Sequence, residues 1–156
     1  MRCLLTICCE SAVVDQINNR LSIFNVIDEL TVQQFPAVFA KVTLVFLVER
    51  EEGDEQQFEA RLAISHSGNE IVTSPISANF ADRPRLRMIP VIQGFVIAAP
   101  GVYRVAFWHG DRELGYWEFT VTPGQAPQVI NASASPSVSV SPSASQSPSS
   151  SASPSS

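Results

Sequence analysis

The clearest pattern in the chain is a two-residue period of apolar side chains on both sides of a short turn. Each side of the turn carries one set of apolar residues that share a parity: Tyr103, Val105 and Phe107 before it, and Trp117, Phe119 and Val121 after it. Successive side chains of a strand point to opposite faces, so each set forms an apolar row that faces the core. Gly110-Asp111 lies between the rows and suits a tight turn. The pattern predicts an antiparallel β-hairpin.

Six other segments have the composition and length of β-strands, and turn residues separate them. Their ranges are 2–10, 21–31, 41–49, 57–65, 70–76 and 85–93. None of them has the helical period of about 3.6 residues. Eight short strands in all predict an all-β fold, a two-layer antiparallel immunoglobulin-like β-sandwich. The alternation breaks near Asn25, which indicates a bulge or a change of packed face, and Pro90 indicates an edge strand or a break.

Tyr103 closely follows Pro100-Gly101, the residues that lead into the hairpin. Immunoglobulin-type sandwiches often place a tyrosine near such a corner, where its hydroxyl bonds back to the backbone. We therefore expect a structural role for Tyr103, in which loss of the hydroxyl lowers stability by about 1 kcal/mol or more.

The composition changes abruptly after residue 130. Residues 131–156 contain fourteen Ser, four Pro and no charged residue, and the prolines recur every six residues at 136, 142, 148 and 154. Hydrophobic content this low does not offset the entropy lost on folding. We predict a β-sandwich domain over 1–125 and a disordered Ser/Pro/Ala-rich tail over 126–156. The tail is interpreted as a neutral solubilising extension, which we favour, or as a spacer or a stalk with modified serines.

The formal net charge of the chain is −5, and all of it belongs to the first 130 residues. Nucleic acids and anionic membranes bind basic surfaces, so the acidic balance disfavours both kinds of partner. The apolar run at the N-terminus ends at Glu10, which is short for a signal peptide. No stretch approaches the length of a membrane span, about 20 apolar residues. We expect a soluble protein in the cytoplasm.

All three cysteines, Cys3, Cys8 and Cys9, lie in the first predicted strand. By parity, Cys3 and Cys9 share one face and Cys8 points to the other. Cys3 and Cys9 would lie about 20 Å apart at the rise of a strand, too far for a disulfide. We interpret the cysteines as small buried hydrophobes in a reducing compartment. A metal or redox site is the alternative, for which the chain lacks a complete ligand set.

Candidates for catalysis or metal binding are few. The acidic loop over 49–55 has carboxylates that calcium could bind, but their spacing matches no known calcium loop, so we favour a solvated turn. His66 and His109 each stand beside a turn without a recognisable nucleophile motif, phosphate loop or CxxC pair. We interpret both as turn-flanking residues. The sequence predicts no catalytic residue, no cofactor and no metal, so we do not expect an enzyme.

Trp108 and Tyr116 have the parity opposite to the apolar rows of the hairpin, so they lie on the outer face of the sheet. Aromatic side chains on such a face can stack on sugars or anchor a partner protein. Cross-strand pairing that covers the sheet is the alternative, and we favour it. Arg104 is the third candidate for a binding surface, and Glu113 and Glu118 would complete a polar rim.

Four segments, in order, carry a resemblance to a known family. They read CESAVVDQINNRLSIFNVID, QFPAVFAKVTLVFLVER, SHSGNE and FVIAAPGVYRVAFWHGDRELGYWEFTV. Together they make Cys9 to Val121 similar to a family of short bacterial proteins known only as a domain of unknown function. The resemblance implies a small β-sandwich and brings no catalytic or ligand residue. The Ser-Pro tail and the cysteine-rich first strand depart from the family pattern.

A complete set of structural patterns without a catalytic constellation predicts a non-enzymatic binding or protein-interaction module. The partner we expect is a macromolecule, a protein before any other, with no nucleic acid and no membrane. The alternative is a carbohydrate- or surface-binding module on a Ser/Pro-rich stalk, which would use Trp108 and Tyr116.

Overall fold

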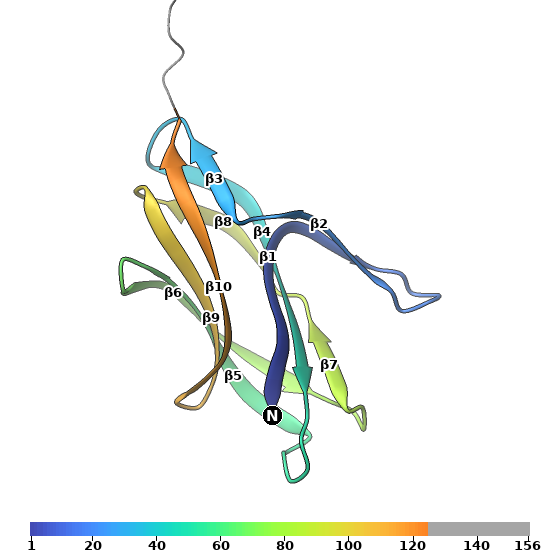
Figure 1. Ribbon diagram of the computed structural model, residues 1–156. Coiled ribbons are helices and arrows are strands. Elements are labelled where there is room, and N and C mark those ends of the chain that lie inside the picture. The colour runs from blue at the N-terminus through green and yellow to red at the C-terminus, as the bar shows by residue number, and fades with distance from the viewer. Residues whose placement is uncertain (125–156) are drawn as a thin grey trace, which may run out of the picture. The chain divides into compact units, whose positions relative to one another are not determined.

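A computed structural model describes residues 1–124, and this range contains ten strands in two sheets and no helix. The β-sandwich predicted from the sequence is confirmed (Figure 1). Because residues 1–124 are free of helices, none of their segments forms an apolar helix that could cross a bilayer. The predicted boundary at residue 125 and the predicted disordered tail over 126–156 lie outside the described residues.

The two sheets are called sheet A and sheet B. Sheet A has the order β2-β1-β4, and β4 also pairs with both β7 and β8; sheet B has the order β3-β10-β9-β5-β6. The strands are β1 (Arg2–Val14), β2 (Leu21–Val26), β3 (Glu29–Val32), β4 (Ala37–Glu49), β5 (Gln57–His66), β6 (Asn69–Asn79), β7 (Arg85–Met88), β8 (Val91–Ile97), β9 (Gly101–His109) and β10 (Arg112–Pro123). The β1–β2 hairpin projects sideways beyond the rest of sheet A (Figure 1).

Two predicted strands are each divided, which raises the expected eight strands to ten. The segment 21–31 becomes β2 in sheet A and β3 in sheet B because the chain crosses between the sheets after Val26. The segment 85–93 is interrupted at Ile89 and Pro90, since proline cannot donate to the ladder of a strand. In addition, β3 runs parallel to β10, whereas the other strand pairs of residues 1–124 are antiparallel, as predicted.

A bulge in β1 overturns the predicted orientation of the cysteines. The register of β1 against β4 shifts between Cys3 and Leu5, so one extra residue is inserted in β1. Such an insertion moves all later side chains to the opposite face. Cys3 and Cys8 therefore both pack toward the core, and Cys9 lies on the other face of sheet A, whereas the sequence placed Cys3 and Cys9 together.

A second inversion of the alternation is shared by β4 and β8. Val42 and Ile92, which are paired across the two strands, both face the core. Three residues away along each strand, Phe39 and Phe95 are also paired and also face the core. Gly94 lies within this step and has φ +65°, a left-handed conformation that glycine adopts without strain. Both strands thus exchange their inner and outer faces at the same level.

The core lies between the sheets and contains both apolar rows of the β9–β10 hairpin. Phe46 of sheet A stacks on Phe107 of sheet B with ring centroids 4.7 Å apart. Tyr103 is 1% exposed, and its hydroxyl donates to the carbonyl oxygen of Ala99 at 2.9 Å. The predicted corner, in which a tyrosine hydroxyl bonds back to the backbone, is confirmed.

Candidate functional site

Arg104 lies on β9, the middle strand of sheet B, and points away from the core. Its Nη1 donates to Oε1 of Glu118 at 2.9 Å, and its Nη2 donates to Oε1 of Glu113 at 2.7 Å. Its guanidinium carbon is 3.7 Å from the ring centroid of Tyr116, a cation–π contact. Partial burial lowers the pKa of Arg104, but the hydrogen bonds to Glu118 and Glu113 outweigh it and raise the pKa overall. Three neighbours on β10 therefore hold Arg104, including both residues of the expected polar rim.

Trp108 lies on the same face of β9 but contacts a different arginine. The guanidinium carbon of Arg61, on β5, is 5.2 Å from the Trp108 ring centroid. Arg61 in turn donates from Nη1 to Oε1 of Glu70 at 2.6 Å. The indole Nε1 of Trp108 is buried and has no hydrogen-bond partner among residues 1–124. Sequence reasoning missed the contact with Arg61 because β5 joins β9 only through long-range pairing.

The outer face of sheet B is consequently covered by its own side chains. Ala63 and Ala106 are paired across β5 and β9 on this face, yet they are only 3% and 6% exposed. Each of the two large aromatic rings on the face, Trp108 and Tyr116, has an arginine over it. The structure thus brings Arg104 and Tyr116 together, and both arginines already have carboxylate partners.

The outer face of sheet A is different, because it exposes a broad set of apolar side chains. Six of them are between 45% and 67% exposed: Val13, Phe24, Val26, Val38, Val91 and Val96. Val26 lies opposite Cys9 on β1, and Val91 lies opposite Thr43 on β4. Cys9 and Thr43 are themselves buried, so the exposed residues form two groups on either side of the middle of the sheet. Within the described range, the large apolar residues of sheet B that have similar exposure are Ile71, Val102 and Tyr116.

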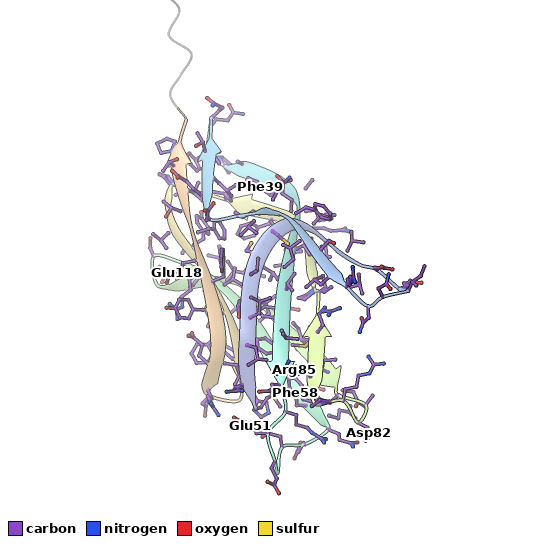
Figure 2. All side chains as sticks on the ribbon, turned by 45° about the vertical axis from the view of Figure 1, so that its right-hand side comes forward. Phe39, Glu51, Phe58, Asp82, Arg85 and Glu118 are labelled. Carbon is purple, nitrogen blue, oxygen red and sulfur yellow. The ribbon has the colours of Figure 1, made fainter. Side chains whose placement is uncertain are left out.

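Charged side chains on the outer face of sheet A are mainly cationic. Four cations in its strands face this side, against one carboxylate: Arg2, Lys41, Arg85 and Arg87 against Glu49. Glu49 accepts hydrogen bonds from Nε of Arg2 at 2.7 Å and from Nε of Arg85 at 2.8 Å, and these bonds lower its pKa. Arg85 lies at the same end of the molecule as Glu51 (Figure 2).

Two of these cations, Lys41 and Arg87, form no ion pair with any carboxylate in residues 1–124. Arg87 donates from Nη1 to the side-chain oxygen of Asn19 at 3.3 Å, a contact that leaves its charge uncompensated. Lys41 is exposed and lies opposite Gln93, a neutral residue. Lys41 is therefore exposed to a partner, whereas Arg87 is half-buried beside Asn19 and lacks only a carboxylate partner among residues 1–124.

A pocket of about 470 Å³ opens between β6 and β8, the edge strands of the two sheets. Its lining is apolar apart from one amide side chain: Ile71, Val72, Ile92, Gln93, Gly94, Phe95, Val96 and Ala98. Pockets of this size can hold a small ligand. The lining contributes no acid, base, thiol or hydroxyl, so the pocket can bind an apolar group but has no side chain suited to general acid–base or nucleophilic catalysis.

The two histidines pack against aromatic rings beside their turns. His66 stacks on Tyr103 with ring centroids 4.4 Å apart, and its Nε2 is 3.1 Å from the carbonyl oxygen of Pro100. His109 makes an edge contact with Phe58 at 5.7 Å. These contacts agree with the interpretation of both histidines as turn-flanking residues.

The acidic loop over 49–55 exposes Glu51, Glu52 and Glu55, in agreement with a solvated turn, and part of its charge is paired. Glu51 and Asp54 both form ion pairs with the N-terminal ammonium of Met1, and Glu49 is held by arginines. Within residues 1–124, no group of three or more His, Cys, Asp or Glu residues is arranged to hold a metal ion. Three of the five carboxylates of the loop thus serve as ion-pair partners in the fold.

The cysteines are free thiols in protected surroundings. Burial raises the pKa of Cys8 to about 12, and burial also raises the pKa of Cys9. A thiol must ionise to act as a nucleophile, so neither residue is activated at neutral pH.

The fold and these surfaces define a two-sheet β-sandwich with one covered polar face and one exposed apolar face. The chain belongs to the family of unknown function DUF6941, whose model matches residues 4–122. The resemblance noted from the sequence, over Cys9 to Val121, is thereby confirmed. No curated protein and no solved structure matches the chain.

Proposed function

We propose that the chain is a non-enzymatic protein-interaction module and that it binds its partner with the outer face of sheet A. The observation that carries this proposal is the group of six half-exposed apolar side chains that four strands place on that face: Val13, Phe24, Val26, Val38, Val91 and Val96. Large contiguous apolar patches are unusual on isolated proteins and mark interaction surfaces. Complete burial of each Val or Phe contributes about 1.5–3 kcal/mol relative to exposure, so a partner that covers the face gains substantially.

This proposal moves the binding surface away from the residues expected from the sequence. Tyr116 is 51% exposed, but Arg104 covers one face of its ring, and Arg61 lies over Trp108. Both arginines are neutralised by neighbouring carboxylates. Cross-strand pairing that covers sheet B, the interpretation favoured from the sequence, agrees with these contacts.

A photocrosslinking experiment tests the proposal. A benzoylphenylalanine placed at position 24 should form an adduct with a defined protein in the native cell, whereas the same group at position 102 should not. Val102 is a suitable control because it is as exposed as Phe24, 51% in both cases, but lies on sheet B. An absence of adducts at position 24, or equal adducts at both positions, would overturn the proposal.

The second candidate, a carbohydrate- or surface-binding module, would use Trp108 and Tyr116 on sheet B. The exposure of Tyr116 favours it, since one side of the ring could stack on a sugar. Glycan-array binding by the full chain that is lost in Trp108→Ala and Tyr116→Ala would support this function. Binding that both variants retain would reject these residues as the sugar site.

We also propose a reducing, cytoplasmic location. The support is that Cys3, Cys8 and Cys9 are all free, two of them buried and one half-buried, and free thiols persist in reducing compartments. Fractionation of native cells, with the chain recovered outside the cytosol, would contradict it.

A further inference from the structure

We infer that the outer face of sheet A recognises an acidic, apolar protein segment, one that presents large apolar side chains flanked by carboxylates. This inference rests on the proposed function and adds the chemistry of the partner. The exposed apolar residues of this face, which include Phe24, Val26 and Val91, would contact the apolar side chains of the partner segment.

The cations lie at two separate levels along β4, with apolar residues between them. Lys41 marks one level, and Arg87, opposite Leu47, marks the other. Six residues of a strand span about 20 Å, so the two charges can flank a segment that lies across the face. Between these levels, Val26 and Val91 lie at the level of Thr43, on either side of β4, while Thr43 and Cys9 between them are buried. Along the face, one cation is therefore followed by exposed valines on both flanks of β4 and then by the second cation.

The net positive charge on the outer face of sheet A is opposite in sign to the net charge of the whole chain. The whole chain has a formal net charge of −5, yet the cations of this face outnumber its one carboxylate, Glu49. Glu49 is shared by Arg2 and Arg85, so it cannot neutralise Lys41 or Arg87. A local positive surface on an acidic protein steers an anionic segment to this face and repels cationic ones.

The same charges argue against a second copy of the chain as the occupant. In a two-fold dimer, each face meets its own copy, so the cations of one chain would approach those of the other. Like charges brought together at an interface cost free energy and suppress the pairing. The overall acidity also disfavours an anionic membrane or a nucleic acid, because both are extended polyanions.

Selection of peptides from a random display library on the immobilised full chain tests the inference. Enriched peptides should combine Leu, Ile, Val or Phe with Asp or Glu, and they should be displaced at high salt. Lys41→Glu and Arg87→Glu should each weaken binding of an enriched peptide by about tenfold, and Phe24→Ser should weaken it at least as much. The matched controls are Arg112→Glu, the same charge reversal away from this face, and Val102→Ser; both should bind like the parent chain.

Each outcome has a defined meaning. Peptides that depend on Phe24 but lack acidic residues, or that bind Lys41→Glu as well as the parent, would overturn the inference while leaving the proposed function intact. Peptides that bind independently of Phe24, or no enrichment at all, would overturn the inference. Binding to vesicles that contain phosphatidylserine, without any enriched peptide, would instead identify a membrane as the occupant. Thermal unfolding of every variant confirms that it is folded.

Discussion

At the scale of single residues, the hydroxyl of Tyr103 connects the hairpin to the segment that precedes it. The hydroxyl donates to the carbonyl oxygen of Ala99, and the ring lies between His66, at 4.4 Å, and Phe119, at 5.4 Å. Pattern and position predicted this role because the corner depends only on nearby residues of the chain. The partners of the ring come from other strands, so the sequence could not indicate them.

Replacing Tyr103 by Phe should lower the free energy of unfolding by about 1 kcal/mol or more. The ring stays in place, but the carbonyl of Ala99 loses its hydroxyl donor in a partly buried site. Urea unfolding measures the change. Tyr116→Phe serves as the control, since the Tyr116 side chain is half exposed, and it should change stability by less than about 0.5 kcal/mol. Equal effects of the two substitutions would contradict the structural role of the corner.

Glu49 gives a pH-dependent contribution to stability. Its hydrogen bonds to Arg2 and Arg85 lower its pKa below the ordinary value of 4.5 in the folded state. A carboxyl group with a depressed folded pKa stabilises the fold above its unfolded pKa, and the contribution is lost as pH falls through the folded value. Glu49→Gln should therefore be less stable than the parent at pH 7 and approach it below pH 4.5. A difference that is independent of pH in urea titrations would rule out this ion pair as the source.

At the scale of elements, β10 closes one side of the sandwich by approaching β1. Gly115 allows this approach, because a Cβ there would lie 2.7 Å from Oγ1 of Thr6 and 3.2 Å from the Cβ and Sγ atoms of Cys3. The bulge in β1 turns Cys3 and Thr6 toward β10, so Gly115 and the bulge together form the contact between β10 and β1, which we call the β1–β10 seam. The segments were predictable as strands, but parity counting fails at a bulge, and it failed for Cys3.

Gly115→Ala should destabilise the fold by about 1–3 kcal/mol, because the added methyl overpacks the seam. Thr6→Ala removes the closest atom, so the double variant should recover part of the loss. A double-mutant cycle from denaturant unfolding measures this coupling. Strictly additive effects of the two substitutions would show that the contact between β10 and β1 is not the cause.

At the scale of the whole molecule, the two outer faces of the sandwich have opposite character. Sheet B pairs its charges and covers its alanines, whereas sheet A leaves apolar side chains and cations accessible. The sequence predicted strands that are apolar on both parities, which is ordinary for a buried strand. Which parity meets the core depends on sheet pairing and on the two inversions, so the exposed face of sheet A could not be recognised in advance.

The apolar face should make self-association increase with salt. At low ionic strength, repulsion between the cationic faces keeps copies apart, and the screening length falls to about 3 Å at 1 M salt. Sedimentation velocity of the full chain should show a larger fraction of dimers or oligomers at about 1 M than at about 0.01 M NaCl. Phe24→Ser should reduce the increase and Val102→Ser should not. Association that weakens with salt would contradict the repulsion between faces.

The matched inversion of β4 and β8, between Phe39 and Val42 in one strand and between Ile92 and Phe95 in the other, has a consequence for how related chains can diverge. A residue added or deleted in β4 alone would turn Phe39 outward and Val38 inward, and the same change in β8 alone would turn Phe95 outward and Val96 inward. The aromatic rings of that strand would then face solvent. Changes of length in these two strands should therefore occur together across relatives, as compensating insertions or deletions at the same level, while the loops at the strand ends vary in length independently.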